Sequence, residues 1–216
     1  MKILAVSDEV VDWLYSPSIT PRCAGVEMVI SCGDLPIWYL EFIASALNVP
    51  CLLVKGNHDK NEIGENGVVR TDAPGWVNID RKLVREEGMT LAGLQGCMRY
   101  TLDSPFQYED REQQLRALSL VPGMALPRLV RGRGLDVLVT HSPPLGVHDS
   151  TDRAHIGFSS FNWLINTFRP RLMLHGHQHR NYGPKSSGIT KVNKTLIVNV
   201  HPYRMITMSD LEIDVL

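Results

Sequence analysis

Two short strings of side chains that can bind metal ions stand far apart in the chain, Gly56-Asn57-His58-Asp59 and Gly176-His177-Gln178-His179. Each closely follows an apolar run, Cys51–Val54 in the first case and Leu172–Leu174 in the second. Short apolar runs that end in glycine predict buried strands that stop at a tight turn. Amide oxygens and imidazoles delivered at such a turn are suited to holding a divalent cation.

Three further apolar runs end in the same way. Residues 2–6 are followed by Asp8, residues 28–30 by Asp34 and residues 137–139 by His141. In open α/β sheets ligands gather at the carboxyl ends of the strands, so one sheet edge could collect all of these side chains. The complete set is Asp8, Asp34, Asn57, His58, His141, His177 and His179.

The chemistry of this set suits a borderline to hard divalent metal such as Mn, Fe, Zn or Co. It contains no thiolate, which argues against a structural zinc site. One carboxylate can bridge two ions, and two ions a few ångströms apart form a clamp for phosphoryl transfer. The residues alone therefore indicate a metal site with hydrolytic potential.

The order of these motifs resembles the calcineurin-like metallophosphoesterases, and the resemblance runs from residue 4 to about residue 200. It implies an α/β fold, a four-layer α/β/β/α sandwich, with a binuclear metal site at the carboxyl ends of the strands. By resemblance, Asp34 would bridge the ions and His58 would act beside them as general acid or electrostatic stabiliser. The implied ligands are Asp8 and His179 for the first ion, and Asn57, His141 and His177 for the second.

The first motif departs from the family pattern, which is Asp-x-His. Val10 stands where the histidine ligand is expected, and valine cannot bind a metal. Purple acid phosphatases, which also lack this histidine, use a tyrosine three residues after the bridging aspartate, but Ile37 occupies that position here. We therefore expect a first ion that is weakly held, held by Glu9 or Asp12, or missing.

Composition is ordinary for a soluble globular protein. The 216 residues predict a single calcineurin-like phosphoesterase domain over residues 1–216. A net charge of −1 provides no basic field for nucleic acid, so a nucleic-acid partner is not expected. Four scattered cysteines indicate reduced thiols. No leader and no apolar run of bilayer-spanning length is visible, which favours a cytoplasmic protein without membrane contact.

The local pattern predicts which segments form elements. Residues 60–75 indicate a loop, and Pro122-Gly123 should break a helical pattern over residues 108–131. The other predicted elements are helices over residues 37–47 and 159–168, short strands within residues 76–96, and strands over residues 195–200 and 205–208.

Two segments outside the main motifs carry reactive side chains. Arg99 follows Gly96-Cys97-Met98, and its guanidinium is suited to bidentate contact with a phosphate. A second polar group lies in the loop after His141, where a solvated loop is favoured over a metal site. This group consists of His148, Asp149, Asp152 and His155.

The favoured function is hydrolysis of a small phosphodiester or phosphomonoester by metal-activated water, with two divalent ions drawn from Mn, Fe, Zn, Co or Ni. A binding scaffold of the same fold, as in the retromer subunit that resembles these enzymes, is the first alternative because Val10 impairs the first site. A nuclease acting on single strands is the second, and the neutral composition counts against it. The oligomeric state is not predicted.

Overall fold

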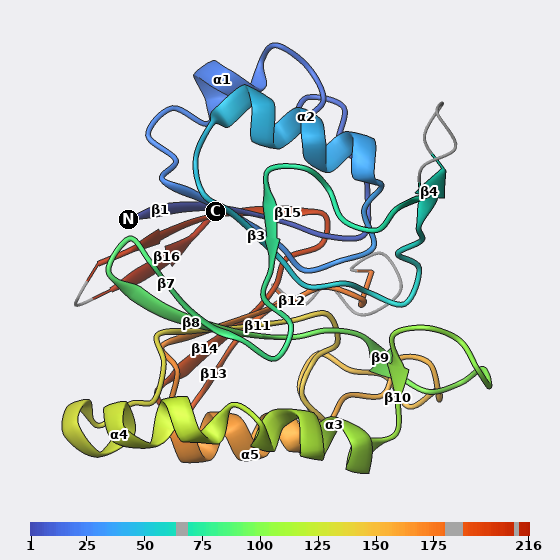
Figure 1. Cartoon of the computed structure of the whole chain (residues 1–216). Coiled ribbons are helices and arrows are strands. Elements are labelled where there is room, and N and C mark those ends of the chain that lie inside the picture. Colours follow the sequence, from blue (N-terminus) through green and yellow to red (C-terminus); the bar gives the residue numbers. More distant parts are fainter. Residues whose placement is uncertain (64–68, 180–187, 210–211) are drawn as a thin grey trace.

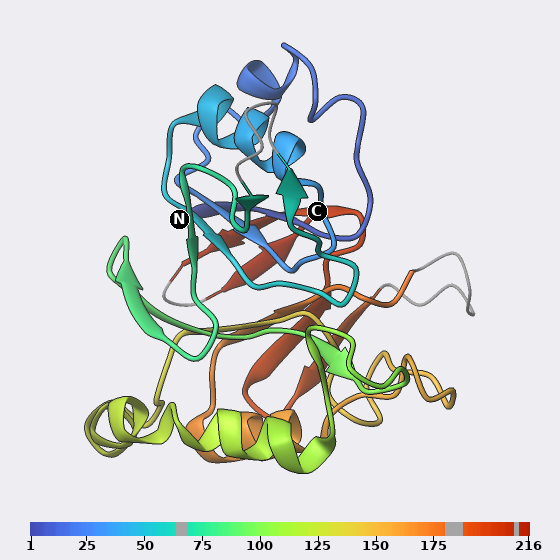
Figure 2. The same cartoon turned by 45° about the vertical axis from the view of Figure 1, so that its right-hand side comes forward.

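The computed structural model describes residues 1–63, 69–179, 188–209 and 212–216. Within them, two six-stranded mixed sheets face each other, and helices cover the outer face of each sheet (Figures 1 and 2). The first sheet, in spatial order, contains β16 (Ile213–Val215), β15 (Tyr203–Met208), β1 (Lys2–Val6), β2 (Met28–Ser31), β3 (Cys51–Leu53) and β6 (Trp76–Asn78). The second contains β13 (Ile189–Val192), β14 (Thr195–Asn199), β12 (Leu172–His175), β11 (Val137–Thr140), β8 (Met89–Leu94) and β7 (Leu83–Glu86). The predicted four-layer α/β/β/α sandwich is confirmed.

The apolar runs form central strands because both of their faces are buried. In β1, Ile3 and Ala5 belong to the core between the two sheets, whereas Leu4 and Val6 belong to the core between the first sheet and the helices that cover it. Strands buried on both faces have continuous apolar sequences rather than alternating ones. β1, β2 and β3 are parallel to one another, as are β11, β12 and β14. Within each sheet, the loops that carry the motifs therefore leave the same edge.

Most of the helices lie where the sequence predicts them. α1 (Ile19–Arg22) and α2 (Ile37–Leu47) cover the first sheet, and α3 (Asp110–Leu118), α4 (Val121–Arg131) and α5 (Ser159–Phe168) cover the second (Figure 1). α2 and α5 have the predicted bounds. The backbone N–H at the start of α2, that of Ile37, donates to the Glu62 carboxylate at 2.8 Å, so a distant side chain caps this helix.

Two predictions of local structure need correction. The helical pattern is interrupted at residues 119–120, before the predicted break at Pro122-Gly123. Pro122 instead lies in the first turn of α4, where a helix has no use for the missing N–H. The predicted loop over residues 60–75 contains the short pair β4 (Glu62–Ile63) and β5 (Val69–Arg70). A second short pair joins β9 (Cys97–Met98) to β10 (Gln107–Tyr108). Among the described residues, no helix has the length and hydropathy needed to cross a bilayer.

Candidate metal centre

The loops after β1, β2 and β12 turn sharply at the residues that carry the motifs. Asp8, Asp34 and His177 have positive φ angles of 67°, 59° and 65°. This conformation is uncommon for residues other than glycine, and it recurs at functional sites. The two sheets meet here, since a Cβ atom on Gly56 would overlap Asp34 and His141. The strand ends thus bring segments from both sheets to one point.

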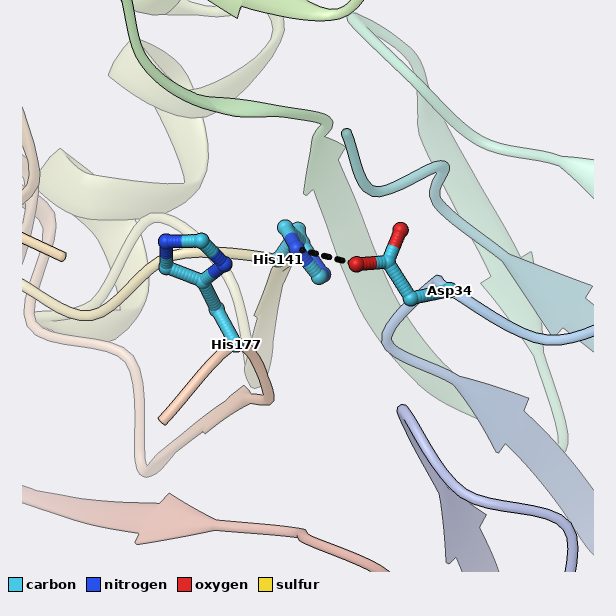
Figure 3. A group of neighbouring side chains, drawn as sticks. All are labelled: Asp34, His141 and His177. Carbon is cyan, nitrogen blue, oxygen red and sulfur yellow. Dashed lines mark ion pairs between the residues drawn. The ribbon is translucent and has the colours of Figure 1, made fainter. Parts of the chain in front are cut away.

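Oxygen and nitrogen acceptors converge around Nε2 of His141. The Asp34 carboxylate lies 3.3 Å from this nitrogen, and Oδ1 of Asn57 lies 3.0 Å from it. Figure 3 shows His141 between Asp34 and His177, and ligand-competent atoms of these three residues lie within 4.8 Å of one another. Such a convergence needs either a proton or a cation at its centre, because acceptors otherwise repel one another.

Main-chain groups fix the orientation of this cluster. Nδ1 of His141 lies 2.7 Å from the carbonyl oxygen of Cys32, which can only accept, so Nδ1 donates and Nε2 faces the other ligands. The backbone N–H of His58 donates to Oδ1 of Asp34 at 2.7 Å. Nε2 of His177 donates to the carbonyl oxygen of Ala154 at 2.8 Å, which leaves Nδ1 of His177 for a cation.

The protonation states are set by burial and by the neighbouring carboxylates. Burial disfavours charge on His141, but Asp34 and Asp8 outweigh it and raise the pKa of this imidazole to about 9. Burial lowers the pKa of His177 to about 3, so His177 is neutral near pH 7 and ready to bind a metal. Burial opposes charge on Asp34 as well, but His141 and the N–H of His58 lower its pKa to about 2.

Asp59 ties the two loops of the first sheet together. One oxygen of its carboxylate accepts from the backbone N–H groups of Gly56 at 2.6 Å and Asp34 at 3.0 Å. Burial, and the negative charge of Asp34, raise its pKa to about 6. The last residue of the Gly56–Asp59 string therefore shapes the site without belonging to the predicted ligand set.

The family model for calcineurin-like phosphoesterases matches residues 4–181. The chain belongs to the calcineurin-like phosphoesterase family. An uncharacterized protein of Methanocaldococcus jannaschii, MJ1162, is 25% identical over 215 residues, covering 94% of this chain and 88% of that protein. The UPF0046 protein T07D4.2 of Caenorhabditis elegans is 38% identical over 60 residues, 27% of this chain and 15% of that protein. The solved structure of TT1561 of Thermus thermophilus is 14% identical, covers 99% of this chain and 97% of that chain, and has a TM-score of 0.61, which shows a shared fold.

Calcineurin-like phosphoesterases typically bind metal, and the ligands implied for the second ion, Asp34, Asn57, His141 and His177, lie together here. The ligands implied for the first ion are less closely gathered. Nε2 of His179 lies 4.0 Å from Oδ1 of Asp8, both of whose oxygens accept from the backbone N–H of His177 at 3.0 Å. Among the described residues, the metal-competent group comprises Asp34, His141 and His177, and Asp8 and His179 stand outside it.

The departure at Val10 has a visible consequence in this member of the family. Val10 packs against the apolar core beneath α2. The Glu9 carboxylate lies 3.4 Å from Nε2 of His201, and the His201 ring stacks on His179 with centroids 4.5 Å apart. Glu9 is thus connected to His179, an implied ligand of the first ion, through the His201 ring.

The remaining predicted residues differ in how they relate to the centre. The His58 side chain is exposed beside it, with its backbone tied to Asp34. The Arg99 guanidinium donates to the Glu112 carboxylate at 2.8 Å and to the carbonyl oxygen of Gln107 at 3.2 Å. Phosphate contact by Arg99 therefore stays a prediction, and it would require this ion pair to open.

The polar group in the loop after His141 does not form one cluster. Nδ1 of His148 lies 2.9 Å from Nε2 of His175, whereas His155 pairs with the Asp152 carboxylate at 2.7 Å. Asp149 accepts from the backbone N–H of Gly157 at 3.1 Å. Each residue thus has its own partner, and His148 is half-buried between His175 and Thr190.

Sequence reasoning missed His201 and Tyr100. His201 lies three positions after the apolar run 196–198, a spacing like that of the other candidate residues, so the same reasoning could have included it. The Tyr100 hydroxyl accepts from Nδ2 of Asn57 at 3.1 Å. Its only signal in the sequence is its position next to Arg99.

Proposed function

We propose that this calcineurin-like phosphoesterase hydrolyses a small phosphodiester or phosphomonoester by metal-activated water, with two divalent ions. The observation that supports this most is the convergence of Asp34, Asn57 and His141 around one point, beside a neutral His177. Carboxylate, amide oxygen and imidazole together suit Mn, Fe, Zn, Co or Ni.

The residues of the chain have distinct roles in this proposal. Bound ions would supply Lewis acidity, which lowers the pKa of water and polarises a phosphoryl oxygen. Asp34, with its low pKa, stays ionised throughout the neutral range and can be shared between two ions. The exposed imidazole of His58 is held beside Asp34 by its own backbone, where it can donate a proton to the leaving oxygen.

The substrate we propose is small. A net charge of −1 provides no long-range attraction for a polyanion. Asp152 lies in the loop whose His155 ring is 5.0 Å from that of His177, so its carboxylate would repel an extended phosphate backbone. Faster cleavage of plasmid DNA than of bis-p-nitrophenyl phosphate, a cyclic nucleotide and a simple monoester would overturn this assignment in favour of a nuclease.

The decisive experiment is removal and return of the metal. Chelation should abolish hydrolysis of bis-p-nitrophenyl phosphate, and adding back Mn, Fe, Zn, Co or Ni should restore it. His141→Ala, purified in the same way, should lose activity by about 100-fold or more, which excludes a contaminating phosphatase. Unchanged hydrolysis after chelation would refute the proposal. A protein that binds no ion and hydrolyses nothing would favour the binding scaffold.

A further inference from the structure

The main chain of the segment after β9 is tied to neighbouring segments by hydrogen bonds. The backbone N–H groups of Tyr100 and Thr101 both donate to Oε1 of the buried Gln107, at 3.1 and 3.0 Å. Nε of Arg153 donates to the carbonyl oxygen of Arg99 at 2.9 Å. The position of Tyr100 is therefore fixed by the fold from both sides.

The Tyr100 hydroxyl accepts a hydrogen bond from the end of the Asn57 amide that faces away from the centre. An asparagine side chain has an acceptor oxygen at one end and a donor NH₂ at the other. Oδ1 of Asn57 faces the protonated Nε2 of His141 at 3.0 Å, and its NH₂ donates to the Tyr100 hydroxyl at 3.1 Å. With the amide reversed, its NH₂ would face the same point and repel a cation.

The same hydroxyl still has a proton to donate. A phenol that accepts one hydrogen bond can donate another at the same time. Tyr100 is 41% exposed, so the ring is open to solvent beside Asn57, a predicted ligand of the second ion. A phosphate group bound at the ions would bring charged oxygens to this side, and hydrogen bonds to charged acceptors are stronger than neutral ones.

We propose that Tyr100 contacts the substrate, with its hydroxyl accepting from Asn57 and donating to a non-bridging oxygen of the phosphate group. This inference rests on the proposed function, because it assigns a phosphate to the same site. The proposal adds one hydrogen-bond donor for the phosphate, the Tyr100 hydroxyl, beside the implied second-ion ligand Asn57.

Tyr100→Phe tests the proposal, because it removes the hydroxyl and keeps the ring. Tyr108→Phe is the matched control, since the Tyr108 hydroxyl accepts from Gln95 at 3.0 Å and has no predicted role at the centre. Calorimetric titration of metal-free protein with Mn²⁺ measures the effect on Asn57. Titration of Mn²⁺-saturated protein with inorganic phosphate measures the substrate contact without depending on turnover.

Tyr100→Phe should weaken Mn²⁺ binding at the tighter site by about 10-fold, the size typical of a partner that orients a metal ligand. It should weaken phosphate binding by a further factor of about 10 or more, as expected for a lost hydrogen bond to a charged group. Tyr108→Phe should match the native protein in both titrations.

Native-like phosphate affinity in Tyr100→Phe would overturn the proposal, whatever happens to Mn²⁺ binding. A native protein that binds Mn²⁺ and phosphate but hydrolyses no phosphoester would refute the proposed function alone. In that case the comparison of Tyr100→Phe with native protein would still decide the role of Tyr100.

Discussion

Metal binding at His141 should release a proton, so the apparent affinity should rise with pH. In the metal-free protein, the carboxylates of Asp34 and Asp8 overcome burial and raise the pKa of His141 to about 9. Nε2 therefore carries a proton at neutral pH, and a cation can bind only after that proton has left. Because the pKa is raised, competition by the proton grows as pH falls below about 9.

The size of the effect follows from the distance between the working pH and this pKa. At pH 7 the proton should weaken apparent metal affinity by about 100-fold relative to the plateau above pH 9. Between pH 6 and 8 the affinity should rise by about tenfold per pH unit, with about one proton released per ion. His177 should contribute nothing in this range, because its pKa is lowered to about 3.

Calorimetry gives a direct measurement. Metal-free protein would be titrated with Mn²⁺ at pH 7 in two buffers that differ in ionisation enthalpy, and the difference in heat counts the protons released. His141→Asn offers an amide oxygen in place of the imidazole nitrogen and removes the titrating group, so it should bind more weakly and release almost no proton. A native release below about half a proton, or an affinity that is flat between pH 6 and 8, would refute the reasoning.

Three further predictions concern single side chains at the centre. His58→Ala should keep its metal content and lower kcat, most for poor leaving groups; loss of metal would instead make His58 a ligand or a structural residue. The first ion should bind more weakly than the second, and Val10→His should tighten it; two equally tight sites in the native protein would contradict this. Gly56→Ala should weaken metal binding, because its Cβ would overlap Asp34 and His141, whereas Gly123→Ala, whose Cβ would approach only Leu83, should bind metal as the native protein does.

Strand ends could be predicted from the sequence because burial on both faces leaves a continuous apolar run, and metal-competent residues within a few positions of its end lie near the sheet edge. This logic identified Asp34, Asn57, His141 and His177, which the structure brings together. Applied to the run 196–198, it would have offered both Asn199 and His201.

The rest depended on contacts between distant segments. Tyr100 reaches Asn57 across 43 positions, and Arg99 turns to Glu112 because the capping residues of α3 lie there. Neither contact could be predicted from a local periodicity or spacing in the sequence. The position of the helix break was predicted too late for a different reason. A proline can follow the end of one helix or stand in the first turn of the next, and the sequence does not distinguish these two cases.

The carbonyl oxygen of Cys32 that orients His141 belongs to the main chain, and so do the N–H groups that hold Asp34 and Asp59. Apart from proline, which removes a backbone N–H, no substitution at those anchoring positions deletes the bonding group itself, so the geometry of the ligands implied for the second ion should be robust to mutation as long as the turns persist. Of the ligands implied for the first ion, Asp8 also accepts from a main-chain N–H, that of His177, whereas the His179 ring stacks on the side chain of His201, which a single codon change can replace. Substitution of His201 should therefore disturb the implied first site more readily than substitution of Cys32 disturbs the implied second site.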